Sequence, residues 1–142
     1  MALVKHLLDQ KGRVTHTIAH DASVLDAIRR MAELGIGALV VMRDTQAAGI
    51  VSERDYARKV ILQGRSSRDT KVTEIMSAPI IAVDEQTTVD RCMRLMTQHR
   101  IRHLPVLDDR ELLGVVSIGD LVKALIAEQR ETIEQLQAYI HQ

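Results

Sequence analysis

The 142-residue chain repeats itself, and this duplication constrains the fold more than any other feature of the sequence. Residues 18–61 align with residues 83–126 at a constant offset of about 65 positions, without a gap. The identical pairs include Val24/Val89, Met31/Met96, Ile36/Ile101, Leu39/Leu104, Val41/Val106, Asp44/Asp109, Gly49/Gly114, Val51/Val116, Ser52/Ser117 and Asp55/Asp120. The fold must therefore be built from two copies of one unit.

Each copy carries the same order of secondary-structure signals. A short extended stretch (14–18 or 80–83) leads into a helix with apolar residues at helical spacing. Two strands rich in branched side chains follow as a hairpin, and a closing helix begins near Glu53 or Ile118. The apolar helix positions are Val24, Ala27, Ile28, Met31 and Leu34 in the first copy, and Val89, Cys92, Met93 and Met96 in the second. The sequence predicts an α/β (α+β) fold of two β-α-β-β-α repeats.

One repeat of this size buries too little apolar surface to be stable alone. We therefore expect the two repeats to pack about a pseudo-two-fold axis, with a helix at each end of the chain. Residues 1–71 are expected to hold an N-terminal helix ended by Gly12, the first repeat and a polar linker. Residues 72–127 are expected to form the second repeat, and residues 128–142 a C-terminal helical extension.

Composition excludes several classes of function. Lys and Arg number 19 and Asp and Glu also 19, and the chain has no Trp or Phe, so neither the charge nor the stacking surface of a nucleic-acid binder is present. No run approaches the roughly 18 apolar residues of a membrane span. The lone Cys92 and the absence of a long apolar leader predict a cytoplasmic protein. Two His pairs have i, i+4 spacing, but no Cys or carboxylate cluster completes a metal site, and no nucleophile motif appears.

Several motifs carry a family resemblance. The segments GIVSERD and GVVSIGD, together with VTEIMSAP and RIRHLPVLD, resemble those of a tandem CBS domain pair, also called a Bateman module. The chain is more narrowly similar to stand-alone single-pair CBS proteins of bacteria and plant organelles. The resemblance implies a regulatory module without catalysis, without a metal and without a catalytic cofactor. It would bind an adenine nucleotide between its repeats and modulate a partner protein. AMP is the first expectation, and ADP, ATP, NAD and S-adenosylmethionine are alternatives.

In each repeat a Ser-x-x-Asp motif stands where a strand ends and a helix begins, as Ser52/Asp55 and Ser117/Asp120. A helix N-terminus favours phosphate, and a carboxylate can accept hydrogen bonds from two ribose hydroxyls. The resemblance assigns the same roles, with the aspartates on ribose and the serines on phosphate. The alternative is a helix-capping box, because the same spacing also occurs at other helix starts of this chain.

The two copies differ most in a basic cluster of Arg100, Arg102 and His103, which precedes the first hairpin strand of the second copy. The equivalent residues of the first copy are small and neutral. In the CBS family this loop approaches the phosphates, so the resemblance implies phosphate contacts for these three residues. The alternative is a solvated loop whose charges cap the preceding helix.

The adenine ring is expected beside the residues that begin each repeat. These are Thr15 and His16 in the first copy, and Ile80 and Ile81 in the second. The isoleucines offer the more apolar wall, which favours the second copy as the main site. A plain core role is the alternative for both isoleucines.

The C-terminal segment carries a heptad pattern. Apolar positions interrupted by Gln129 recur four and three residues apart, at Val122, Ile126, Gln129, Ile133, Leu136 and Ile140. This spacing is typical of a short coiled-coil seam. The helix either packs on its own module or contacts another chain. We expect a homodimer, since CBS pairs commonly dimerise. The competing function is a structural or dimerisation module with vestigial ligand sites.

Overall fold

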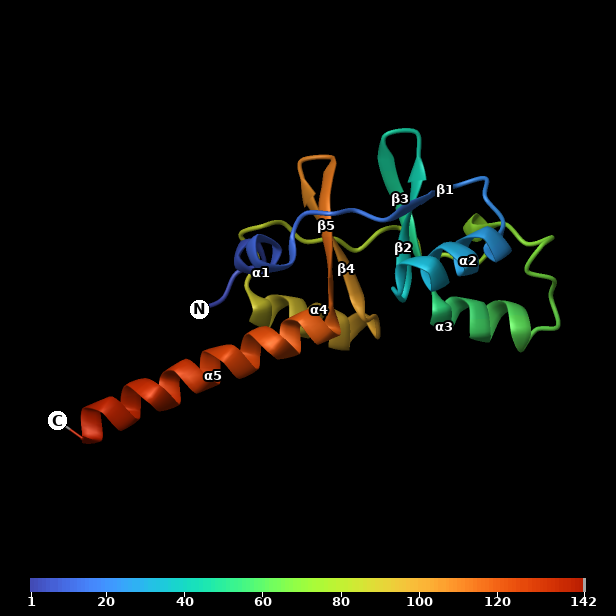
Figure 1. Ribbon diagram of the computed structural model, residues 1–142. Coiled ribbons are helices and arrows are strands. Elements are labelled where there is room, and N and C mark those ends of the chain that lie inside the picture. The colour runs from blue at the N-terminus through green and yellow to red at the C-terminus, as the bar shows by residue number, and fades with distance from the viewer. Residues whose placement is uncertain (142) are drawn as a thin grey trace. The chain divides into compact units, whose positions relative to one another are not determined.

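The computed structural model describes residues 1–141 and confirms the predicted fold class (Figure 1). The first repeat runs through β1 (Thr17–Ala19), α2 (Val24–Leu34), β2 (Ala38–Arg43), β3 (Gln46–Ser52) and α3 (Glu53–Tyr56), which continues into the π-helical turn η1 (Ala57–Ile61). The second repeat comprises α4 (Val89–His99), β4 (His103–Asp108), β5 (Glu111–Ser117) and α5 (Ile118–Ile140). Two short helices, α1 (Val4–Lys11) and η2 (Val72–Glu74), precede the repeats.

The two sheets differ by one strand. In the first repeat β2 pairs in parallel with β1 and antiparallel with β3. In the second repeat β4 and β5 form a two-stranded sheet, and the strand expected over residues 80–83 is reduced to one parallel bridge between Val83 and Val106. The Asp84 carboxylate accepts hydrogen bonds from the Gln86 N–H (2.9 Å) and the Thr87 hydroxyl (3.1 Å), which turns the chain away immediately after Val83.

Both hairpins turn on an aspartate. Asp44 and Asp109, one of the identical pairs, each adopt a left-handed conformation with φ of 57°. Aspartate tolerates this conformation better than most residues because its short polar side chain can bond to the local backbone. The same turn chemistry thus gives both hairpins the same length.

The chain divides into two compact units that do not follow sequence order. The first-repeat unit contains residues 15–81 and 109–112, and the second-repeat unit contains residues 1–14, 82–108 and the chain from 113 onward. Residues 1–14 precede the first repeat in sequence but pack in the second-repeat unit. Residues 72–81 precede the strands and helices of the second repeat but pack in the first-repeat unit. We call residues 1–14 and 72–81 the lead-in segments. The N-terminal helix, which the sequence groups with residues 1–71, thus packs in the second-repeat unit. The domain boundaries expected from the sequence and the packing of the repeats about a pseudo-two-fold axis stay predictions.

Each lead-in segment fills part of the core of its unit. In the first-repeat unit Val72 and Ile75 join the cluster made by α2 and the sheet. In the second-repeat unit the buried residues of α1 are Val4, Leu7 and Leu8. Each lead-in segment is thus a structural part of the unit in whose core it packs, not of the repeat that follows it in sequence.

The predicted apolar helix faces are largely confirmed. The buried members are Val24, Ala27 and Met31 on α2, and Val89, Cys92 and Met96 on α4. Ile28 and Met93 are half-buried, whereas Leu34 is 39% exposed. Leu34 lies in the last turn of α2, immediately before the left-handed C-cap Gly35, where the helix already leaves the core.

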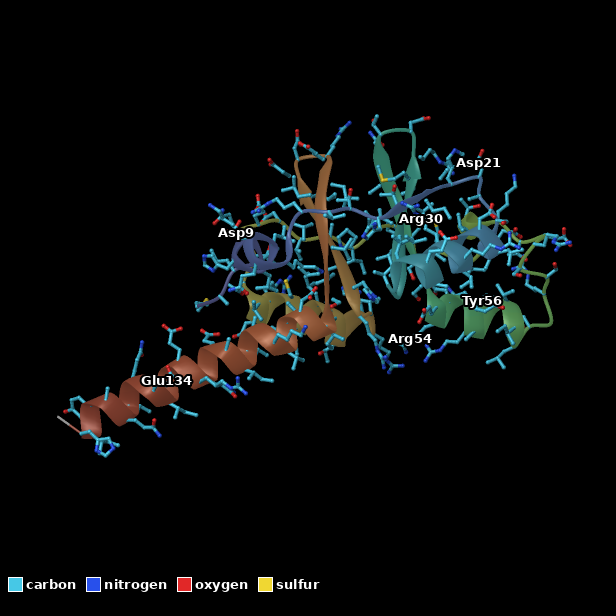
Figure 2. All side chains as sticks on the ribbon, viewed as in Figure 1. Asp9, Asp21, Arg30, Arg54, Tyr56 and Glu134 are labelled. Atoms are coloured by element: carbon cyan, nitrogen blue, oxygen red, sulfur yellow. The ribbon has the colours of Figure 1, made fainter. Side chains whose placement is uncertain are left out.

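Helix α5 continues well past the core of its unit. Its first turns pack beside α4, and Leu121 is its buried residue (Figure 1). The seam residues that follow are exposed, with Ile133 at 54%, Leu136 at 57% and Ile140 at 73%. Figure 2 shows the side chains around Glu134 spreading from the helix into open space. Among residues 1–141, no helix has the length and hydropathy needed to cross a membrane.

Candidate ligand-binding site

Both Ser-x-x-Asp motifs form helix-capping boxes. In the first repeat the Asp55 N–H donates to the Ser52 hydroxyl oxygen (3.2 Å), and the Ser52 N–H and hydroxyl donate to Asp55 Oδ2 (2.9 and 3.0 Å). In the second repeat the Asp120 N–H donates to the Ser117 hydroxyl oxygen (3.2 Å), and the Ser117 N–H donates to Asp120 Oδ2 (2.8 Å). The capping interpretation is therefore correct for both motifs, and it leaves the ligand role as a second use of the same side chains.

A lysine also contacts each capping aspartate. Lys59 Nζ lies 3.3 Å from Asp55 Oδ1 and donates to the carbonyl oxygen of Ile75 (2.8 Å). Lys11 Nζ donates to Asp120 Oδ2 (2.7 Å) and to the carbonyl oxygen of Val115 (2.9 Å). Each lysine thus joins a lead-in segment to the start of a capped helix.

The sequence reasoning missed both lysines for an identifiable reason. Lys59 lies one helical turn after Asp55, but the equivalent position of the second repeat is Ala124, so the repeat alignment did not single it out. Lys11 lies 109 residues from Asp120 in the chain. Only the exchange of lead-in segments brings it to the second-repeat motif, and no local signal predicts that exchange.

The first amide groups of the closing helices are partly occupied. The Glu53 N–H donates to the carbonyl oxygen of Gly37 (3.1 Å), and the Ile118 N–H donates to that of Arg102 (2.9 Å). The third amide of each helix is used by the capping serine. Phosphate binding at these helix starts therefore depends mainly on side-chain donors, because few amide groups remain for an anion.

The second-repeat unit gathers charged groups around His103. This half-buried imidazole has a lowered pKa, chiefly because burial disfavours its charged form, and the positive charges of Lys11 and Arg102 lower it further. The Asp120 carboxylate acts in the opposite direction. His103 is thus a neutral hydrogen-bonding group at pH 7, set among two cations and one carboxylate.

Asp120 is held in its ionised form. Burial alone raises the pKa of its carboxyl, but the hydrogen bonds from Lys11 and Ser117 outweigh that effect and the net pKa is lowered. An ionised carboxylate accepts hydrogen bonds and donates none, which suits contacts to hydroxyl groups.

Arg100 stands apart from this group. It is the C-cap residue of α4, in a left-handed conformation with φ of 56°, and its backbone N–H donates to the Met96 carbonyl oxygen. The equivalent residue of the first repeat is Gly35, with φ of 67°. Arg100 therefore ends a helix through its backbone, and its role toward phosphate stays a prediction, as it does for Ser52 and Ser117.

The four residues expected beside adenine all belong to the first-repeat unit. Thr15, His16, Ile80 and Ile81 are half-buried there, in the same unit as Asp55. Ile80 and Ile81 are thus not in the unit that holds Asp120, although the sequence assigned them to the second copy. The roles of all four toward adenine stay predictions.

The first-repeat unit also contains a cleft of about 640 Å³, which does not coincide with the capping boxes. Its lining includes Thr15 but neither Ser52 nor Asp55. Three carboxylates line it, from Asp21, Asp44 and Glu111, and no lysine or arginine does. Such a cleft repels phosphate, so it does not suit an anionic nucleotide.

Other reactive groups are inert or dispersed. Burial raises the pKa of the Cys92 thiol to about 11, so the thiol is protonated at neutral pH. Among residues 1–141, His, Cys, Asp and Glu form no group of three or more with the arrangement of a metal site.

The repeated β-α-β-β-α architecture, with a Ser-x-x-Asp capping box at the start of each closing helix, defines a tandem pair of small α/β domains. The CBS domain family matches residues 13–61 and 72–127, and the chain belongs to this family.

Similar proteins agree with that assignment. The mitochondrial CBS domain-containing protein CBSX3 of Arabidopsis thaliana is 50% identical over 125 residues, which are 84% of this chain and 61% of the plant protein. A putative signal-transduction protein with CBS domains from Burkholderia ambifaria is 53% identical, and its structure matches with a TM-score of 0.86 over 90% of this chain and 96% of that one.

Two further comparisons bear on ligand and length. The CBS domain pair of protein MJ0100, solved in complex with 5′-methylthioadenosine and S-adenosyl-L-methionine, is 26% identical with a TM-score of 0.78, over 90% of this chain and 98% of that one. The chain spans 61% of the length of the plant relative and 58% of that of an uncharacterised relative from Methanopyrus kandleri.

Proposed function

We propose that this protein is a non-catalytic sensor that binds an adenine nucleotide at the Ser117–Asp120 motif and changes its affinity for a partner protein in response. The observation that carries the proposal is the meeting of an ionised ribose acceptor, Asp120, with the phosphate-binding chemistry of Arg102 and His103 in one unit. AMP is the first expected ligand. ADP, ATP, NAD and S-adenosylmethionine share its adenosine part and are the alternatives.

The carboxylate of Asp120 is arranged to accept a ribose hydroxyl. In the part of the chain that the structure describes, its hydrogen bonds from Ser117 and Lys11 converge on Oδ2. Oδ1 is thereby left for a ligand, and the side chain is 21% exposed, which gives it access to solvent. A ribose hydroxyl bonded to an ionised acceptor supplies a stronger contact than one bonded to a neutral group.

The adenosine part of the proposal is supported by the MJ0100 domain pair, whose two ligands both contain adenosine. The first-repeat motif, with Ser52 and Asp55, is proposed as a second and weaker site. At this first-repeat site the adenine base is proposed to lie beside Thr15, His16, Ile80 and Ile81, since they belong to the same unit as Asp55. Both oxygens of Asp55 already have partners, because Ser52 bonds to Oδ2 and Lys59 lies beside Oδ1.

Partners and location complete the proposal. We expect a homodimer held by the exposed seam of α5, and a regulated protein whose identity the chain does not specify. The balanced charge argues against nucleic acid as a partner. A cytoplasmic location rests on the single cysteine, and the mitochondrial name of the plant relative makes an organelle the alternative that cell fractionation would test.

A second function is a structural or dimerisation module with vestigial sites. It is favoured by the capping boxes and lysine contacts, which already use both aspartates, and by the exposed tail of α5. Calorimetric titration of the purified chain with AMP, ADP, ATP, NAD and S-adenosylmethionine separates the two functions. Saturable binding of at least one ligand supports the sensor, and no binding at millimolar concentration leaves the dimerisation module.

A further inference from the structure

A site that recognises ribose through a carboxylate faces an electrostatic conflict. The ionised carboxylate of Asp120 attracts ribose hydroxyls but repels the phosphate attached to the same ribose. The repulsion grows with each phosphate charge. A site that accepts nucleotides rather than nucleosides therefore needs a cation close to this carboxylate.

Lys11 is that cation by position. Its ammonium lies 2.7 Å from Asp120 Oδ2 and 2.9 Å from the carbonyl oxygen of Val115. An ammonium has three N–H donors, so these two contacts leave one donor for a ligand oxygen. The Lys11 side chain is 41% exposed, which places that donor within reach of a ligand from solvent.

The backbone around Lys11 is well fixed. Lys11 is the last residue of α1, whose Val4 and Leu8 are fully buried. The helix ends at Gly12, and the next residue, Arg13, bonds to both Asp9 (2.7 Å) and Glu85 (2.5 Å). Figure 2 shows Asp9 on this helix. Lys11 therefore meets Asp120 with little freedom left to lose when a ligand binds.

We propose that Lys11 is the specificity-determining residue that makes the second-repeat site select phosphorylated adenosine ligands over uncharged ones. The inference rests on the proposed function and adds the ligand class to it. Lys11 balances the charge of Asp120 and offers its third donor to a phosphate oxygen, while Asp120 keeps its contact with the ribose. Ligand selection thus depends on a residue of the lead-in segment, outside both repeats.

The test compares adenosine, AMP and ATP on four proteins: the parent chain, Lys11→Met, Lys11→Arg and Lys59→Met. Methionine keeps the apolar stem of lysine and removes the charge. We expect Lys11→Met to weaken AMP binding about fivefold more than adenosine binding, the size of one partly exposed charge interaction. ATP should be affected more than AMP, and the difference should shrink at high salt. Lys11→Arg should restore the AMP-to-adenosine ratio.

Lys59→Met is the matched control, because Lys59 also joins an aspartate to a carbonyl oxygen but in the other unit. It should leave the AMP-to-adenosine ratio of the stronger, second-repeat site unchanged. An equal loss of adenosine and AMP affinity in Lys11→Met would overturn the inference, since Lys11 would then only position Asp120. If Lys11→Met does not fold, an AMP-to-adenosine ratio in Lys11→Arg that stays at the parent value supports the inference and a collapsed ratio overturns it. A parent chain that binds none of the three ligands would instead refute the proposed function itself.

Discussion

Gly49 lies so close to Met76 that a Cβ on it would stand 2.7 Å from the Met76 Sδ, and equally 2.7 Å from the carbonyl oxygen of Ser77. At the equivalent Gly114 a Cβ would stand 2.9 Å from a terminal methyl of Leu8. At each glycine, a lead-in segment packs against a strand of the unit whose core it completes. The missing side chain is what allows that contact, which gives a physical reason for glycine at both equivalent positions.

These contacts predict unequal effects of two matched substitutions. Gly49→Ala should destabilise the protein by about 1–3 kcal/mol, because the new methyl overlaps a backbone oxygen that cannot move alone. Gly114→Ala should cost less, since only the flexible end of Leu8 must move. Urea unfolding of both variants is the measurement. A larger loss of stability in Gly114→Ala would contradict the packing described for the lead-in segments.

The half-buried His103 predicts a pH dependence of stability. The pKa of His103 is lowered in the folded protein from its ordinary value of 6.5. As the pH falls through 6.5, the unfolded chain gains a proton that the folded chain does not bind, so the free energy of unfolding should decrease until the lower folded pKa is reached. Unfolding measured between pH 5 and pH 8 should show this slope, and His103→Asn should reduce it. An unchanged slope in the variant would assign the dependence to another group.

The two aspartates predict a separation of capping from ligand binding. Asp55→Ala and Asp120→Ala both remove a capping-box carboxylate, so their losses of folding stability should be similar, about 1 kcal/mol each. Asp120→Ala should in addition weaken the binding of adenosine and of AMP by roughly 1.5–3 kcal/mol, because the ribose loses a charged acceptor. Calorimetry on both variants tests this. If neither variant differs from the parent in binding, the two motifs are helix caps only.

Ligand binding should stabilise the folded chain, since the unfolded chain has no site. At a ligand concentration of about 100 times Kd, the gain in the free energy of unfolding should be near 2.7 kcal/mol. Thermal unfolding across a ligand series reports this as a rising midpoint. A midpoint that stays constant with every adenine ligand at millimolar concentration speaks against the sensor function.

The exposed seam of α5 predicts a concentration-dependent association. Deleting residues 128–142 should weaken the dimer without unfolding the repeats, because the described part of this segment is exposed apart from a partly covered Glu128. Ile133→Ala and Leu136→Ala should reproduce much of the loss, as the apolar centre of the seam. Sedimentation of the full and shortened chains gives the association constants. Equal constants would show that the tail does not carry the dimer contact.

The sequence predicted what depends on local chemistry. The repeat alignment located both hairpins, whose turns use Asp44 and Asp109, and both closing helices, which begin at Glu53 and Ile118. The capping boxes followed from the Ser-x-x-Asp spacing because a capping bond joins residues only three positions apart.

Longer-range features could not be predicted in this way. Nothing in the apolar pattern of residues 1–14 says which sheet they cover, so the Lys11–Asp120 contact was missed. Residues 80–83 were likewise predicted to form a strand, because their side-chain pattern resembles that of β1. The backbone turns away at Asp84, and only the bridge at Val83 remains.

The exchange of lead-in segments makes the two halves of this duplicated chain an obligate pair. Cutting the polypeptide at the sequence boundary near residue 71 would leave the first repeat without Val72 and Ile75, which fill its core, and the second without α1. Neither half of the sequence is therefore an excisable module, because each fragment would lack part of the core of its own repeat.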